Sequence, residues 1–130
     1  MQYIRTHIHS RVLTSYMHKY INYAHKKGFI DIMLNNNGSA LTPRRCQEAL
    51  DSGLTRMRFS LDAFTPETYS KVRVGSLPLE KVIRNIDTFL ELKEKGNYKL
   101  PVTGVSFVKM KQNEHELDDF INFWKNKVDM

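Results

Sequence analysis

The stretch Arg56-Met57-Arg58-Phe59-Ser60-Leu61-Asp62-Ala63-Phe64 predicts a short buried β-strand that ends in polar residues. Its apolar bulk comes from Met57, Phe59 and Leu61, while Ser60 and Asp62 stand where the strand ends. Thr65-Pro66-Glu67 follows directly and is typical of a helix start, because a hydroxyl caps the helix and proline fits its first position. Such carboxyl ends of parallel strands are where α/β proteins build binding sites.

The length, composition and net charge of the sequence limit the classes of protein to which it can belong. The chain has 130 residues, enough for one domain around one core, and its hydrophobic fraction of 41% excludes wholesale disorder. It contains no run of about 18 apolar residues, so no transmembrane helix is expected. The single cysteine, Cys46, excludes an internal disulfide framework and, with no secretory signal visible, favours the cytoplasm. The formal charge of +6 permits an anionic partner without naming one.

Helix and strand patterns alternate on both sides of the opening stretch. Before it lie a weak strand or irregular lead-in over 1–14, a helix over 15–27, a strand over 29–34, and a helix that begins at Thr42-Pro43. After it come a helical turn over 66–71, a helix over 78–95, a strand over 101–108, a helix ending near Trp124, and the start of a further strand over 127–130. The buried stripe expected for the helix over 15–27 is Met17, Tyr20, Ile21 and Ala24. Asn113-Glu114-His115-Glu116 has the spacing of a capping box.

Strands that alternate with helices imply a parallel sheet with right-handed crossovers. We therefore expect an α/β fold, a partial (β/α) barrel with three or four parallel strands and helices outside, in one domain over 1–130. The pattern begins and ends inside a repeat, which predicts a piece of a larger barrel.

The carboxyl ends of parallel strands meet at one edge of the sheet, and polar residues follow each expected strand there. These are Asn35, Asn37 and Gly38 after the first, Ser60 and Asp62 after the second, and Lys109, Lys111 and Asn113 after the third, with Arg73 on a loop above. Together they offer donors, acceptors and cations, which suit a ligand with a hydroxylated sugar and a carboxylate or phosphate.

Each of these residues also has a purely structural interpretation. An Asn-Gly pair after a strand is commonly just a turn. Ser60 and Asp62 can cap the helix that follows, and Arg73 can be a solvated loop charge. The expected convergence on one edge favours the ligand-binding interpretation.

The ordered set Leu34-Asn35-Asn36-Asn37-Gly38-Ser39, Ser60-Leu61-Asp62-Ala63 and Thr65-Pro66-Glu67-Thr68-Tyr69, with Arg73, resembles the radical S-adenosylmethionine (SAM) superfamily. It looks most like the branch of sulfatase-maturating and peptide-modifying enzymes. The resemblance covers residues from about His18 to Met130 and implies the middle of a partial (β/α)₆ barrel. It implies that Ser60 contacts the ribose or methionyl part of SAM, that Arg73 contacts its carboxylate, and that Asn37 and Gly38 form the turn beside it. Asn36 stands where the family usually has threonine.

Two features of the family are missing from this sequence. The family binds a [4Fe–4S] cluster through a C-x₃-C-x₂-C loop, and one electron from that cluster cleaves SAM to a 5′-deoxyadenosyl radical. The only cysteine here is Cys46, on the apolar face of an expected helix, and one thiolate cannot hold such a cluster. The Gly-Gly-Glu-Pro type turn for the SAM amino group is also absent from residues 1–29. We therefore expect a fragment or a degenerate copy that keeps part of the SAM site and lacks the redox centre.

Other functional classes are less well supported. His7, His9, His18 and His25 have no carboxylate or cysteine at a metal-ligand spacing, and the acidic run from Glu114 to Asp119 suits the start of a helix. The basic residues lie on different elements, which does not favour nucleic-acid binding. An interaction or oligomerisation module stays open, because an incomplete barrel exposes sheet edges.

The functional expectation is therefore a radical SAM core segment that contributes part of the SAM site. Its parent activity would act on a peptide, a protein or a small metabolite. An N-terminal segment or a partner chain would supply the cluster ligands.

Overall fold

The computed structural model describes residues 4–7 and 16–130, with side chains from residue 16 onward. Its strands are β1 (Ile4–His7), β2 (Ile32–Asn36), β3 (Arg56–Ser60) and β4 (Val102–Ser106). Its helices are α1 (Met17–Lys26), α2 (Pro43–Leu50), α3 (Pro66–Val72), α4 (Leu79–Lys95), the 3-10 turn η2 (Glu114–Glu116) and α5 (Leu117–Trp124). The rest of the expected lead-in over 1–14 lies outside the described residues.

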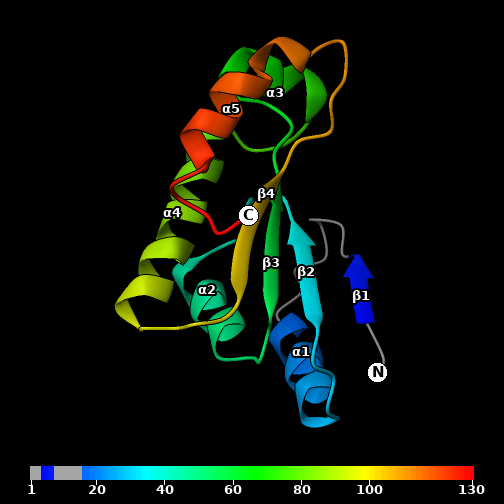
Figure 1. The fold of residues 1–130 in the computed structure, drawn as a ribbon, viewed down its shortest axis with the longest axis vertical. Coiled ribbons are helices and arrows are strands. Elements are labelled where there is room, and N and C mark those ends of the chain that lie inside the picture. The colour runs from blue at the N-terminus through cyan, green and yellow to red at the C-terminus, as the bar shows by residue number, and fades with distance from the viewer. Residues whose placement is uncertain (1–3, 8–15) are drawn as a thin grey trace.

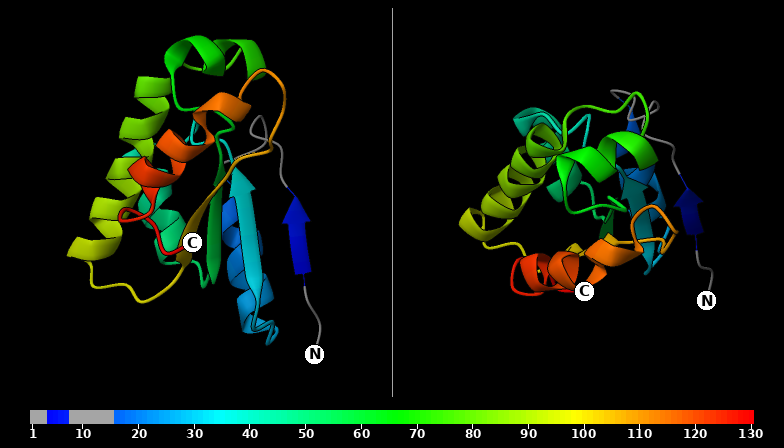
Figure 2. Two further views of the ribbon diagram at one scale, coloured as in Figure 1. Left: turned by 45° about the horizontal axis from the view of Figure 1, so that its top comes forward. Right: turned by 90° about the horizontal axis from the view of Figure 1, so that it is seen from above.

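The strands form one parallel sheet in the order β1-β2-β3-β4, the same as their order in the chain. All strands point the same way, and α3 and the start of α5 lie beyond their carboxyl ends (Figure 1). In both views of Figure 2, β1 is at the edge of the sheet away from α4 and α5. The α/β fold with parallel strands is confirmed, and it is consistent with part of a (β/α) barrel.

Two helices begin as the sequence predicts. The Thr42 and Thr65 hydroxyls accept hydrogen bonds from the backbone N–H of Arg45 and Thr68, and a proline follows each threonine. These caps satisfy donors that would otherwise lack a partner at a helix start. The Thr65 cap also fixes the direction in which the chain leaves β3 at the carboxyl edge.

The core lies between the sheet and α1, α2 and α4. Met57 and Phe59 of β3 are fully buried, and the Phe59 ring meets the Phe89 ring of α4 edge to face with centroids 5.8 Å apart. The alternate residues of β3, Arg56, Arg58 and Ser60, are exposed or half-buried. Because side chains alternate across a strand, these three lie on the opposite face of the sheet.

Three expectations about local structure are wrong. Tyr20 is 67% exposed and does not belong to the buried stripe of α1, whose buried residues are Met17, Ile21 and Ala24. The spacing of Asn113 and Glu116 does not produce a capping box, because both side chains bond to groups near α3 and β4. Residues 127–130 form no assigned strand, although Met130 exchanges backbone hydrogen bonds with Thr103 and Val105 beside β4.

Among residues 4–7 and 16–130, no helix combines the length and the apolar character that a membrane span requires.

Candidate functional site

Asp62 and Arg73, two of the predicted site residues, are in direct contact. The Arg73 Nη2 atom donates to the Asp62 Oδ2 atom over 2.6 Å, and the two side chains are 27% and 10% exposed. Asp62 follows β3, and Arg73 is the C-terminal cap of α3. The pair therefore bridges the two ends of the β3–α3 unit at the carboxyl edge of the sheet.

The Asp62 backbone is held in an unusual conformation. Its φ angle is +62°, in the left-handed region that few residues other than glycine adopt. The Asp62 Oδ1 atom accepts from the Val108 N–H at 2.7 Å, and the Asp62 carbonyl accepts from the Asn113 Nδ2 atom at 2.8 Å. Both carboxylate oxygens of Asp62 thus have protein partners, which makes this residue the anchor of Arg73.

Arg73 also faces open space. It lines a hollow of about 280 Å³ between α3 and the start of α4, together with Tyr69, Ser76 and Glu80. Burial raises the pKa of the Tyr69 hydroxyl, although the Ser76 side chain and the Arg73 charge lower it in part. The guanidinium has five N–H donors, so its bond to Asp62 leaves others for a ligand carboxylate.

Ser60 ends β3 on the face opposite the core. Its hydroxyl accepts a 3.4 Å bond from the Ser106 hydroxyl, and the register pairs these two residues across β3 and β4. The weak bond between two half-buried hydroxyls leaves each able to bond to a ligand as well.

The Asn37-Gly38 turn follows β2 at the same edge. The Asn36 Oδ1 atom accepts from the Gly38 N–H at 2.7 Å, and the Asn37 Oδ1 atom accepts from the Ser39 N–H at 3.0 Å. Gly38 has a φ angle of +76°, and a Cβ there would meet Val82 Cγ1 at 3.0 Å. The turn therefore packs directly on α4, and only glycine fits without strain.

The structure groups these predicted residues into separate clusters. Asn36 and Phe59 are the last residues that pair between β2 and β3, so the register places the residues that follow them, Asn37 and Ser60, at one edge. No hydrogen bond among the described residues joins Asn37 or Gly38 to Asp62 or Arg73.

The expected third-strand residues differ from one another. Asn113 is fully buried, and its Nδ2 atom donates to the Asp62 and Val108 carbonyls, so it stabilises the backbone at this edge. Lys109 and Lys111 are exposed, and Lys109 lies 3.9 Å from Glu114.

Sequence reasoning missed two residues of this region. No site role was expected for Arg58, yet it shares the face of β3 with Ser60, and no side chain among residues 16–130 pairs with it. The alternation from Arg56 to Ser60 contained that signal. Glu116 is only 3% exposed and contacts the start of α3, which no local pattern predicts because its partners lie far away in the chain.

The residues of this chain do not fit an iron–sulfur cluster. Cys46 is fully buried in α2, and burial raises the pKa of its thiol to about 11, although a backbone hydrogen bond lowers it in part. Within the described part of the chain, no three His, Cys, Asp or Glu side chains are grouped as metal ligands. A protonated, buried and solitary thiol cannot replace the thiolates that such a cluster needs.

The polar residues at the carboxyl edge do fit part of a small, charged organic ligand. Arg73 supplies a partly exposed cation, Ser60 supplies a half-buried hydroxyl, and the buried Ser39 hydroxyl has no hydrogen-bond partner within the described residues. A buried hydroxyl without a partner costs stability unless something else bonds to it.

This parallel α/β fold, with its polar residues at the carboxyl edge, is consistent with a segment of a (β/α) barrel. The pattern of the Radical SAM superfamily matches residues 8–123, and the chain belongs to this superfamily. SAM and a [4Fe–4S] cluster are the cofactors that membership implies.

Proteins named GTP 3',8-cyclase are similar to this chain. The one from Limosilactobacillus fermentum is 32% identical over 76% of the chain, and the one from Clostridium acetobutylicum is 33% identical over 71%. A third, from Acidothermus cellulolyticus, is 39% identical over 44%. The aligned parts span only 28%, 27% and 16% of these relatives. Their name places them in a different branch from the sulfatase-maturating enzymes that the motifs resemble.

Proposed function

We propose that this chain forms part of the SAM-binding half of a radical SAM enzyme, without the cluster-binding part. The observation that carries the proposal is the Asp62–Arg73 pair at the carboxyl edge of β3, beside Ser60, in a chain of this superfamily. One Asp62 oxygen accepts from Arg73 and the other accepts from the Val108 N–H, so the carboxylate orients the guanidinium. The other N–H groups of Arg73 bond to the SAM carboxylate in this proposal.

The other edge residues take supporting roles in this proposal. Ser60 bonds to the ribose or methionyl part of SAM, and the Asn37-Gly38 turn lies alongside it. The turn is fixed by its own side chains and by Asn85, whose Nδ2 atom donates to the Gly38 carbonyl at 2.9 Å. SAM supplies the radical precursor in this family, while these residues bind and orient it.

A small anionic metabolite is our proposed substrate class for the parent enzyme. The similar proteins are named for a reaction of GTP, and Arg58 offers a half-buried cation on the face of β3 opposite the core, with no side-chain partner among residues 16–130. A peptide substrate, as in the sulfatase-maturating branch, is the alternative. Titration with GTP and with a cysteine-containing peptide separates them: saturable binding of GTP that Arg58→Ala weakens supports the first.

The primary test is calorimetric titration of the purified chain with S-adenosylhomocysteine under anaerobic conditions. We expect saturable binding. A folded, monodisperse sample that releases no binding heat and shows no line shifts in NMR would overturn the proposal. A dimer that ignores the ligand would instead favour an interaction module, and binding of RNA or DNA that weakens with salt would favour a nucleic-acid role.

A further inference from the structure

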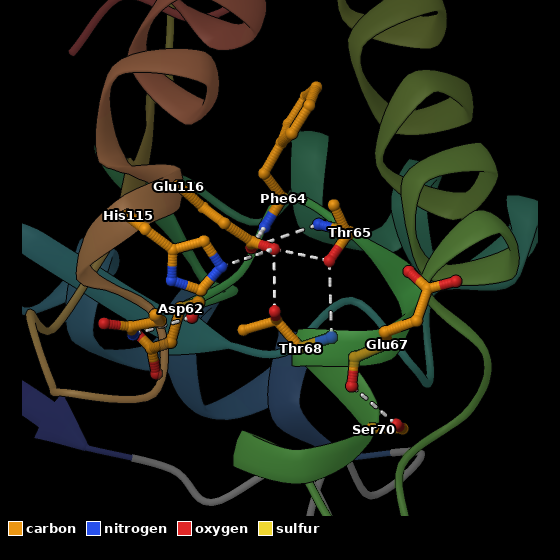
Figure 3. Close-up of polar contacts among 9 residues, drawn as sticks. Asp62, Phe64, Thr65, Glu67, Thr68, Ser70, His115 and Glu116 are labelled. Carbon is orange, nitrogen blue, oxygen red and sulfur yellow. Dashed lines mark hydrogen bonds and ion pairs between the residues drawn. The ribbon is translucent and has the colours of Figure 1, made fainter.

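The Glu116 carboxylate joins two elements that are distant in sequence. It extends from the start of α5 toward the first turn of α3, where Thr65 and Thr68 face it (Figure 3). The Glu116 Oε2 atom accepts from the N–H groups of Phe64 and Thr65 at 2.7 and 3.1 Å. The Oε1 atom accepts from the hydroxyls of Thr65 and Thr68, the latter at 2.7 Å.

Asn113 holds the residues just before this turn. Its Nδ2 atom donates to the carbonyl of Asp62, and its Oδ1 atom accepts from the N–H of Met110. Asn113 is fully buried and Glu116 is 3% exposed, so water does not compete for these bonds. Two side chains from the β4–α5 connection therefore hold both ends of the segment from Asp62 to Thr65.

This segment determines where Arg73 lies. The segment begins with Asp62, which holds the Arg73 guanidinium, and it ends with Thr65, which caps α3. Arg73 closes the other end of the same short helix. A displacement of the first turn of α3 thus moves both the carboxylate that orients Arg73 and the backbone that carries it.

We infer that Glu116, with Asn113, is a positioning residue that sets the Asp62–Arg73 pair for ligand binding. The inference rests on the proposed function, which supplies the identity of the ligand. The position of Arg73 can nevertheless be measured with no ligand bound. Glu116 does not touch the ligand in this inference; it acts through the first turn of α3.

The test compares Glu116→Ala with Glu116→Gln and with Asp129→Ala. Glutamine keeps the length and an oxygen that accepts from Phe64 and Thr65, and its amide can donate to the two threonine hydroxyls. Asp129 is the matched control, because its Oδ2 atom accepts from the Thr103 N–H and hydroxyl and from Lys93, outside this site. Each variant is checked by circular dichroism and thermal melting.

The readouts are S-adenosylhomocysteine affinity and the NMR signal of the Arg73 Nε–H group. We expect Glu116→Ala to weaken binding about tenfold, the scale of one lost hydrogen bond to a charged group, and to shift the Arg73 signal. Glu116→Gln should recover most of both. Asp129→Ala should lower the melting temperature and leave both readouts as in the parent.

The outcomes separate the inference from the proposed function. If the parent does not bind the ligand, the proposed function fails and the Arg73 signal alone decides the positioning role. An unchanged Arg73 signal in folded Glu116→Ala overturns the inference. If that variant does not fold, Thr68→Val decides, because it removes only one of the four bonds to the carboxylate; a parental Arg73 signal there overturns it as well.

Discussion

Asp62 and Arg73 form an ion pair in which both oxygens of the acid accept hydrogen bonds, whereas the base uses one of its N–H groups to bond to the acid. The Asp62 Oδ2 atom lies 2.6 Å from Arg73 Nη2, and the Oδ1 atom bonds to the Val108 N–H. Asp62 is nearly buried at 10% exposure, whereas Arg73 is 27% exposed and lines the hollow between α3 and α4. In the proposed function, the remaining N–H groups of Arg73 are the donors that bind the SAM carboxylate.

Replacement of Arg73 tests its direct role. Arg73→Ala should weaken S-adenosylhomocysteine binding by about 1–3 kcal/mol, because it removes a charge-assisted hydrogen bond to the ligand carboxylate. Lys71→Ala is the control, since Lys71 is an exposed cation of the same helix. Calorimetry measures both, and equal affinity of Arg73→Ala and the parent would remove Arg73 from the site.

Two substitutions of Asp62 separate its charge from its backbone role. Asp62→Asn keeps an oxygen for Val108 and tolerates a φ angle of +62°, so it should cost about 1–2 kcal/mol of unfolding free energy. Asp62→Ala also loses that acceptor and strains the left-handed backbone, which adds about 1–2 kcal/mol. Urea unfolding at neutral pH measures the difference. The account of Asp62 as an anchor is wrong if alanine costs no more than asparagine.

Gly38 should be far less tolerant of a side chain than Gly75. Both have positive φ angles, +76° and +78°, so alanine strains either backbone by a similar amount. A Cβ at Gly38 would also meet Val82 at 3.0 Å and Ile86 at 3.2 Å, whereas one at Gly75 has nothing within 4 Å. Gly38→Ala should therefore cost about 1–3 kcal/mol more than Gly75→Ala in thermal or urea unfolding. Similar losses in the two variants would contradict the close packing of the turn on α4.

Glu116 should make the fold sensitive to acid. Burial raises the pKa of this carboxyl, but the hydrogen bonds from Thr65, Phe64 and Thr68 prevail and lower it from 4.5 to about 2. A lowered pKa in the folded state stabilises the protein above pH 4.5, and this stabilisation is lost as the pH falls from about 4.5 to 2. Its full size is on the order of 3 kcal/mol.

The control for this pH dependence is Glu116→Gln, which has no carboxyl to protonate. Unfolding free energies measured between pH 2 and 7 should fall less steeply below pH 4.5 in that variant than in the parent. The Nε2 atom of the exposed His115 lies 3.7 Å from the Glu116 Oε1 atom. His115→Ala therefore accompanies the comparison. Parallel curves for the parent and Glu116→Gln would refute the proposed pKa.

The Cys46 thiol should not react with thiol reagents while the protein is folded. Its thiol is fully buried and has a pKa of about 11, so almost none of it is thiolate at neutral pH. A colorimetric thiol reagent should react only after urea is added. Anaerobic incubation with iron and sulfide should likewise give no stable cluster absorption on the folded chain. Rapid labelling of the native protein would contradict the burial of the Cys46 thiol in α2.

Local signals in the sequence were sufficient for most of the framework. Thr42-Pro43 and Thr65-Pro66 predict where two helices start because caps act within one turn, and both predictions are confirmed. The strand from Arg56 to Ser60 is equally local, since alternating side chains reveal its two faces. Tyr20 was misplaced because a tyrosine counts as apolar in a periodic pattern, whereas here its ring lies in solvent.

The site was harder to predict because it depends on contacts between distant residues. The sequence places Asp62 and Arg73 at one edge but does not reveal that they pair. Asn113 and Glu116 have the spacing of a helix cap, yet tertiary bonds to Asp62 and to the first turn of α3 replace the local ones. Such bonds follow from how β3 and β4 are aligned, and short sequence windows do not contain that information.

The order of the sheet, β1-β2-β3-β4, has a consequence for how the protein assembles in time. Each of β2, β3 and β4 pairs with the described strand made just before it, so a growing chain can extend the sheet in one direction as it is synthesised. The longest connection between consecutive strands separates β3 from β4, because it contains both α3 and α4. The carboxyl end of β3 therefore acquires the support of Asn113 and Glu116 only after β4 has been made, and the Asp62–Arg73 pair should reach its final position no earlier than that.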